Sequence, residues 1–354
     1  MHMELIYKEI YMSLQKYIVT RDDSIYEAFP DVTLTKDGKL VCVFTECNAH
    51  GDRNNSRIMI TTSTDHGRTW SEKKPFTERT TFDDFFNCSR VSTLPDGRLA
   101  IICDRIYCRE KPGTKNEIYI WFSDDNGETW SDPVLFPYNG FVPDKYRVLK
   151  SCRHVVSAQN YGQTGKLEQY LWYSDDGGNT WSDRVTVASD ERYNLCEGCL
   201  LETPEGALVC YLRENSGRGY DCFKTVSYDN GQSWSEVANV PLPGCHRPVA
   251  GYLSNGNILI THRFMQGGKG WLGSWTQNVF ASFLPGEQAT AMERSQQSAR
   301  IFPLDFDRSP VSDIGYTGWV QFEDGEIYVV NYIVDDAPKA HIRGYSFRFE
   351  DVLL

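Results

Sequence analysis

The stretch from Ser174 to Trp181, which reads Ser-Asp-Asp-Gly-Gly-Asn-Thr-Trp, decides the fold because its frame occurs three more times in the chain. The other copies are Ser63 to Trp70, Ser123 to Trp130 and Ser227 to Trp234. Each copy has Ser, Asp, Gly and Trp at relative positions 1, 3, 5 and 8. Chance would give such a match at roughly one in 10⁵ starting points, so the frame is an internal repeat.

The frame has the composition of a tight turn followed by a strand. Its Asp, such as Asp176, can accept hydrogen bonds from backbone N–H groups, and the Gly two residues later can take the positive φ that closes a hairpin. The Trp then begins the next strand with a large apolar ring. The Ser positions are 60, 51 and 53 residues apart, which suits one four-stranded sheet per repeat. We therefore expect these Asp residues to form turns rather than to catalyse.

These frames resemble the Asp boxes of the sialidase (neuraminidase) superfamily. The resemblance implies an all-β fold, a six-bladed β-propeller of four-stranded antiparallel sheets, with the boxes on the face away from the active site. Six blades of about 50 to 60 residues would account for the whole chain of 354 residues. We therefore expect one domain over residues 1–354, in which residues 1–25 supply a strand that closes the ring.

A second repeat marks the first hairpin of five blades. Each copy ends in a Gly and lies between two β-rich runs, which is a strong hairpin signal. The copies are Lys36-Asp37-Gly38, Pro95-Asp96-Gly97, Pro204-Glu205-Gly206, Ser254-Asn255-Gly256 and Glu323-Asp324-Gly325. The gap between Gly97 and Gly206 contains the third box. The blade over roughly 140–190 has therefore lost its Asp-Gly turn.

The turn glycines give a common register in which blades can be compared. In a propeller the innermost strands run along the central axis, so the starts of the first strands and the ends of the second strands converge at one rim. Nine residues before the turn Gly stand Phe29, Cys88, Glu197, Arg247 and Tyr316, and seven residues after it stand Thr45, Asp104, Arg213, Arg263 and Tyr332. An apolar core would place Val or Leu at such positions.

This register predicts a pocket formed by Glu197, Arg213, Arg247, Arg263 and Tyr316. A Tyr beside a carboxylate that can take its proton is an activated nucleophile, and clustered guanidiniums bind a carboxylate. A polar rim can also be structural, because propeller channels hold water and ionic networks.

The resemblance extends to the candidate site. The segments Leu195 to Glu202 and Tyr211 to Asn215 look like those that hold the sialidase glutamate, here Glu197, and the second arginine of the substrate-carboxylate triad, here Arg213. Gly315 to Trp319 looks like the segment of the tyrosine nucleophile, here Tyr316. Asp52 occupies the loop where the family keeps its acid/base aspartate. Such enzymes retain anomeric configuration through a tyrosyl-glycosyl intermediate.

One part of the family pattern is missing. Sialidases begin their first blade with Arg-Ile-Pro, whereas this chain has Ala28-Phe29-Pro30, so the first triad arginine is absent. Arg263 takes the place of the third arginine, although its surrounding motif is not matched. Arg247 has no counterpart in the family and is our candidate to compensate for the missing arginine.

Composition restricts the partners. A net charge of −12 and a pI near 5.1 argue against nucleic acid or an anionic membrane. We find no signal peptide and no membrane span, and the odd number of 11 Cys suits reduced thiols, so we expect a cytoplasmic protein. Cys196 and Cys199 lack a second pair with ligand spacing, so we predict no metal and no cofactor.

We therefore expect an exo-acting, retaining glycoside hydrolase that removes a terminal sialic acid or a similar acidic sugar from a glycan. Tyr316 is the expected nucleophile, Glu197 its base and Asp52 the acid/base. Two alternatives remain open. One is a glycosidase or lyase acting on a different ulosonic or uronic acid, which the missing arginine favours. The other is a non-catalytic glycan-binding propeller, which would need neither a nucleophile nor its base.

Overall fold

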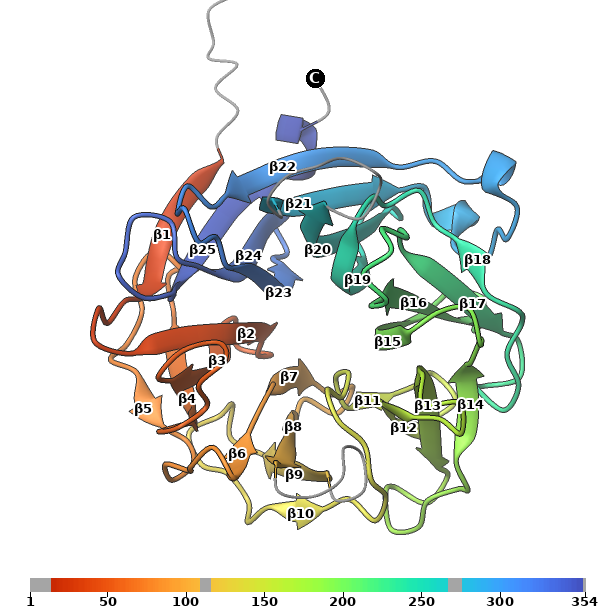
Figure 1. Cartoon of the computed structure of the whole chain (residues 1–354), viewed down its shortest axis with the longest axis horizontal. Coiled ribbons are helices and arrows are strands. Elements are labelled where there is room, and N and C mark those ends of the chain that lie inside the picture. Colours follow the sequence, from red (N-terminus) through yellow and green to blue (C-terminus); the bar gives the residue numbers. More distant parts are fainter. Residues whose placement is uncertain (1–13, 109–115, 267–275, 353–354) are drawn as a thin grey trace, which may run out of the picture.

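The computed structural model describes residues 14–108, 116–266 and 276–352. Six antiparallel sheets stand in a ring around a common axis (Figure 1), which confirms the predicted six-bladed β-propeller. The helical elements of these residues are three short 3-10 segments, Gly286–Gln288, Arg294–Gln296 and Phe349–Val352. Within these ranges no helix has the length and apolar character needed to cross a membrane.

The first three blades follow one another along the chain. Blade one contains β2 (Tyr26–Leu34), β3 (Leu40–Cys47), β4 (Arg57–Ser63) and β5 (Lys74–Pro75). Blade two contains β6 (Asp84–Phe86), β7 (Arg90–Thr93), β8 (Leu99–Tyr107), β9 (Glu117–Ser123) and β10 (Val134–Leu135). Blade three contains β11 (Arg147–Val148), β12 (His154–Tyr161), β13 (Leu167–Ser174) and β14 (Val185–Ala188). In blade two, β6 and β7 both pair with β8, so its first strand is split rather than followed by an extra one.

The last three blades complete the ring. Blade four contains β15 (Leu195–Glu202), β16 (Leu208–Glu214), β17 (Phe223–Ser227) and β18 (Ala238–Asn239). Blade five contains β19 (Cys245–Tyr252), β20 (Ile258–Gln266), β21 (Thr276–Leu284) and β22 (Arg300–Phe306). Blade six contains β23 (Ile314–Gln321), β24 (Glu326–Ile333) and β25 (His341–Arg348).

The fourth strand of blade six comes from the other end of the chain. Strand β1 (Gln15–Thr20) pairs antiparallel with β25, with Gln15 opposite Ser346. Figure 1 shows β1 on the outer edge of this sheet. The beginning of the segment from which we predicted ring closure, residues 1–13, lies outside the described residues.

The apolar core lies between blades rather than at one centre. Six clusters of buried side chains are present in the described part, one between each pair of neighbouring blades. Blades one and six, for example, share Phe44, Tyr328 and Val330. Each blade is thus covered on both faces by its neighbours, which explains why β3, an inner strand of its blade, is buried along its whole length.

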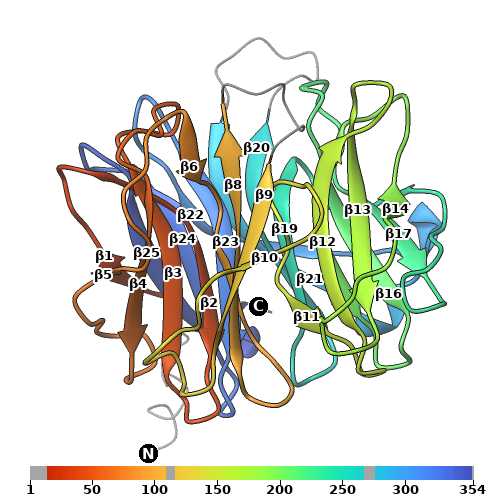
Figure 2. The same cartoon turned by 90° about the horizontal axis from the view of Figure 1, so that it is seen from below.

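The predicted turns and boxes gather on one face. Figure 2 shows the strands running between two opposite faces of the ring. In blade four Leu208, at the start of the second strand, pairs with Ser227, the first residue of the box. The box therefore lies beside the first hairpin turn, and Glu214, at the other end of the second strand, points to the opposite face.

The turn of blade three differs from our expectation. Its sequence lacks the Asp-Gly pair, but a turn closes between Leu149 and Arg153, and Cys152 has a φ of 65°. A cysteine thus occupies the left-handed position that a glycine takes in the other first hairpins, such as Gly206 at φ 90°.

Candidate active site

A β-bulge in the first strand of five blades positions the candidate residues. At this point the first strand has one residue more than the second strand. The extra segment includes the positions nine residues before the turn glycines, namely Phe29, Cys88, Glu197, Arg247 and Tyr316. Phe29, Glu197 and Arg247 have φ angles of 58°, 48° and 50°. Bulges change the direction of a side chain, and such backbone conformations persist only where their surroundings hold them.

In blade six a glycine absorbs the backbone change. Gly315 has a φ of 116°, and a Cβ built there would lie 2.5 Å from the Cβ of Arg263. Any larger residue would therefore displace Arg263. Gly315 lets the strand that carries Tyr316 approach the strand that carries Arg263.

Tyr316 and Glu197 meet directly. The Tyr316 hydroxyl donates a hydrogen bond to Oε1 of Glu197, although the two residues are 119 positions apart. Nη1 of Arg213 donates to Oε1 and Oε2 of Glu197 at 2.8 and 3.0 Å. Oε1 of Gln159 accepts a hydrogen bond from the Glu197 backbone N–H at 2.6 Å. Groups from blades three, four and six therefore fix the carboxylate.

The electrostatics of this pair set its resting protonation states. Burial raises the pKa of Tyr316 well above its usual value, and the neighbouring Glu197 charge raises it further. Burial also acts to raise the pKa of Glu197, but the charges of Arg213 and Arg247 and the hydrogen bond from Tyr316 lower it overall. Tyr316 is thus a neutral phenol against an ionised carboxylate that can accept its proton.

Arg247 and Arg263 flank the Tyr316 ring. Their Cζ atoms lie 4.9 and 5.7 Å from its centroid, and the two residues are 3% and 4% exposed. Nη2 of Arg247 donates to the Pro143 carbonyl at 2.9 Å. Among the described residues, Nη1 of Arg247 and Nε of Arg263 have no hydrogen-bond partner. Buried guanidinium donors without acceptors are costly, and a carboxylate is the group that matches them best.

The position of the missing arginine is filled by apolar groups. Ala28 is fully buried and pairs with Thr45. The Phe29 ring packs 5.4 Å from the Tyr316 ring, centroid to centroid. The Arg53 guanidinium also lies over the Phe29 ring, 4.7 Å from its centroid. Phe29 therefore forms an aromatic wall beside the nucleophile candidate.

Asp52 is the one predicted site residue that the structure does not bring into this cluster. It lies in the loop between β3 and β4. Its Oδ1 accepts hydrogen bonds from the backbone N–H and Nδ2 of Asn54, at 3.1 and 2.8 Å. Its Oδ2 accepts one from Nδ2 of Asn48 at 3.0 Å. Within the described ranges Asp52 forms no hydrogen bond or ion pair with Tyr316, Glu197 or the three arginines.

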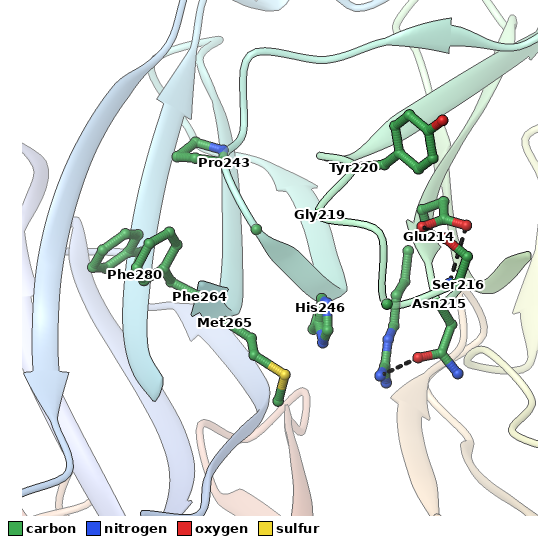
Figure 3. A pocket seen from close by; sticks show the side chains of 13 residues that line it. Glu214, Asn215, Ser216, Gly219, Tyr220, Pro243, His246, Phe264, Met265 and Phe280 are labelled. Carbon is green, nitrogen blue, oxygen red and sulfur yellow. Dashed lines mark hydrogen bonds between the residues drawn. The ribbon is translucent and has the colours of Figure 1, made fainter. Parts of the chain in front are cut away.

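A cavity of about 500 Å³ adjoins the cluster on the side of Arg213. Figure 3 shows Phe264, Met265 and Phe280 along one side of it and Asn215 on the other, with His246 between them. The cavity therefore has an apolar wall and a polar wall that leads to the arginines. This combination is typical of sites that bind small organic ligands.

Sequence reasoning missed two residues of the site. His246 approaches Nη2 of Arg263 with Nδ1 at 3.4 Å, and burial together with the charges of Arg213 and Arg263 lowers its pKa far below the usual value. Gln159 supports Glu197, as described above. Gln159 stands seven residues after Cys152, so the register would have included it if the cysteine had been identified as the turn residue of blade three.

Comparison with known proteins agrees with this architecture. The model of a family described as a BNR repeat-like domain matches residues 20–137 and 106–329. The chain belongs to this family. A sialidase of Paraclostridium sordellii is 22% identical to this BNR-repeat chain over 251 residues, which are 60% of this chain and 59% of the relative. The chain thus spans less than two thirds of that relative's length.

Two solved structures share the fold of this BNR-repeat propeller. A Dyadobacter fermentans protein of unknown function has a TM-score of 0.76 and 21% identity, covering 94% of this chain and 98% of its own. The Hadza microbial sialidase Hz136 has a TM-score of 0.71 and 17% identity, covering 96% and 69%. The family match and these neighbours confirm the expected sialidase-like propeller.

Proposed function

We propose that the protein is a retaining glycoside hydrolase that removes a terminal acidic sugar, with Tyr316 as nucleophile. The observation that supports this most is the hydrogen bond from Tyr316 to Glu197, a carboxylate held ionised by Arg213. The curated relative described as a sialidase supports the same class of reaction. A glycan-binding protein would need neither the phenol nor its buried base.

In the proposed first step the Tyr316 oxygen attacks the anomeric carbon and the bond to the leaving oxygen breaks. The phenol proton passes to Glu197, and an acid protonates the leaving oxygen. In the second step water attacks the anomeric carbon and gives a proton to the conjugate base of that acid, the bond to the Tyr316 oxygen breaks, and Glu197 returns its proton to Tyr316. A neutral phenol suits a substrate with a carboxylate near the reacting carbon, because a carboxylate nucleophile would repel that charge.

The proposed clamp for the substrate carboxylate consists of Arg213, Arg247 and Arg263. Each of these arginines holds one buried donor that lacks an acceptor among the described residues: Nε of Arg213, Nη1 of Arg247 and Nε of Arg263. Because Nη1 and Nη2 of Arg213 already bind Glu197 and Asn215, we expect Arg247 and Arg263 to carry more of the contact. A substrate carboxylate would supply the missing acceptor and offset the cost of burying these charges.

A second candidate substrate class is a different ulosonic acid or a uronic acid. It is favoured by Ala28 and Phe29, which place a methyl group and an aromatic ring where the family resemblance implies an arginine. An enzyme with this altered wall would bind a sugar acid whose carboxylate is oriented differently.

Turnover of aryl glycosides tests both candidates. We expect release of the aryl group from at least one donor in a panel of sialic, other ulosonic and uronic acids, with retention of configuration observed by NMR of the first product. Tyr316→Phe is the matched control, because it removes the attacking oxygen alone. Turnover restricted to neutral glycosides would contradict the clamp, and inversion would contradict the nucleophile.

A further inference from the structure

A second cluster of polar side chains stands at the rim beside the proposed site. Asp313 lies just before β23, three residues ahead of Tyr316. Its Oδ1 accepts a hydrogen bond from the Tyr332 hydroxyl at 3.0 Å, and its Oδ2 accepts one from the Tyr26 hydroxyl. His50 Nδ1 lies 2.7 Å from the same Oδ2. Blades one and six therefore meet through one carboxylate.

The hydrogen bond to Asp313 fixes how His50 can exchange a proton. Burial acts to raise the pKa of Asp313, but the hydrogen bonds and charge of His50 and the hydrogen bond from Tyr26 lower it overall, so Asp313 is an ionised acceptor. Nδ1 of His50 must then carry a hydrogen to donate. Nε2 is left as the atom that gains or loses a proton, an arrangement that a carboxylate imposes on catalytic histidines elsewhere.

One aromatic ring stands between His50 and the nucleophile candidate. The His50 ring centroid is 5.3 Å from that of Phe29, which is 5.4 Å from that of Tyr316. One aromatic ring therefore touches both groups. The His50 side chain is 52% exposed, so its free edge is open to a ligand that enters from the rim.

Asp52, by contrast, has the properties of a turn residue. Hydrogen bonds from the Asn48 side chain and then from Asn54 lower its pKa. A general acid must hold a proton near the working pH, and a carboxylate held ionised by three hydrogen bonds is a poor donor. These contacts instead close the loop that carries His50.

We propose that His50, oriented by Asp313, transfers the proton to the leaving group, and that Asp52 shapes the loop. This inference rests on the proposed glycosidase function. In the first step Nε2–H of the imidazolium gives its proton to the leaving oxygen as the glycosidic bond breaks. In the second step neutral Nε2 takes a proton from the attacking water, which restores the imidazolium. Asp313 keeps its charge throughout and is a positioning residue.

The charged and titratable groups around this histidine come from both blades. Asp313 precedes β23, Tyr26 belongs to β2 and Tyr332 belongs to β24. Arg53 shares the loop of His50, and its guanidinium lies over the Phe29 ring. Lys339 donates to the Asn48 carbonyl at 2.8 Å. Arg263 adds a charge that lowers the pKa of Asp313. The pH dependence of the proton transfer therefore reflects all of these groups, and Asp313 is the one that contacts His50 directly.

Leaving-group dependence tests the proposal. His50→Gln should lower kcat/KM about 10²-fold or more on an acidic glycoside with a sugar or alkyl leaving group, but less than about tenfold on its 4-nitrophenyl glycoside, which needs no proton. The basic limb of the pH profile should disappear with the poor leaving group. Asp313→Asn should show the same pattern. Asp52→Asn should lower kcat/KM by a similar factor on both substrates.

His66→Gln is the matched control, because His66 lies at a box on the opposite face and also contacts a carboxylate, with Nδ1 3.0 Å from Glu326. It should leave both rates unchanged. Two results would overturn this inference and leave the proposed function standing, provided that Tyr316→Phe is inactive. One is an equal loss of activity for His50→Gln on both leaving groups. The other is a selective loss on the poor leaving group for Asp52→Asn. Full activity of Tyr316→Phe, or no turnover by the wild type, would overturn the proposed function and this inference with it.

Discussion

The two faces of the propeller are held by different kinds of contact, local on one face and long-range on the other. On the box face the turn of each motif is closed by hydrogen bonds within its own eight residues, while side chains such as His66 also reach a neighbouring blade. In the box that begins at Ser123, for example, Oδ1 of Asp125 accepts from the Ser123 hydroxyl at 2.8 Å and from the Thr129 N–H at 2.9 Å, and the Trp130 indole donates to the Gly127 carbonyl. On the active-site face, Tyr316 and Glu197 meet across 119 residues.

The difference separates stability from chemistry. Local hydrogen bonds let a box form wherever its sequence occurs, so it can repeat unchanged in four blades. The site depends instead on what each blade contributes to a shared rim, so the same bulge carries Phe29 in one blade, Glu197 in another and Arg247 in a third. We expect substitutions on one face to alter stability, and those on the other to alter turnover.

The largest effect should follow from Tyr316→Phe. The variant loses the oxygen proposed to attack the substrate and its hydrogen bond to Glu197, while the buried ring and its neighbours remain. We expect kcat to fall by about 10³-fold or more with little change in the melting temperature, measured by steady-state kinetics and thermal denaturation. Retention of more than about a tenth of the activity would show that another group is the nucleophile.

Trp181→Ala should produce the largest change on the box face. Its ring packs edge-on against Phe136, with the centroids 4.9 Å apart. Because the Trp181 ring is half-buried, we expect a loss of about 2 to 4 kcal/mol in the free energy of unfolding, below the range for fully buried aromatic residues. Denaturant unfolding measures this loss. Specific activity per folded molecule should be unchanged, and a fall in kcat at an unaltered melting temperature would break the separation of the faces.

Arg247→Lys tests the clamp. Lysine keeps the charge but loses the planar fork that can bind a carboxylate with two donors. We expect KM for an acidic donor to rise about 10-fold to 100-fold, or roughly 1.5 to 3 kcal/mol, with Arg247→Ala more severe. The methyl ester of the same donor is the control. If the acid and the ester lose affinity equally, Arg247 supports the pocket and does not contact the substrate carboxylate.

The smallest effect should come from the box carboxylates at acid pH. Hydrogen bonds from Thr129, first from its hydroxyl and then from its N–H, lower the pKa of Asp125 to about 2. The unfolded chain protonates such a group near pH 4, so its stabilising contribution is present above that pH and is lost as the pH falls towards 2. The melting temperature of Asp125→Asn should therefore fall slightly less between pH 4 and 2 than that of the wild type. An identical pH dependence would mean that the box does not stabilise the fold through this charge.

Sequence predicted the parts of the molecule that repeat. The boxes and the turn glycines gave the number of blades and a register, and the register selected Glu197, Arg213, Arg247, Arg263 and Tyr316, which the structure brings together. This worked because a turn is a local property and because equivalent positions in a propeller must face the same rim.

What the sequence did not reveal depends on contacts between blades. Nothing near His50 in the sequence shows that Asp313 and Tyr26 will converge on it. Gln159 was missed because Cys152 replaced a turn glycine, which hid the register of one blade. Asp52 matched a family position, but its hydrogen bonds to Asn48 and Asn54 are visible in three dimensions alone.

The pairing of β1 with β25 has a consequence for biosynthesis. A ribosome makes β1 first and its partner near the end, so β1 must wait as an unpaired edge while the intervening blades are translated. Tyr316 emerges late as well, long after Glu197 has left the exit tunnel. The nascent chain therefore acquires its ring and its proposed reaction centre at almost the same moment. A translation product truncated before β23 would have an open seam and would lack the proposed nucleophile.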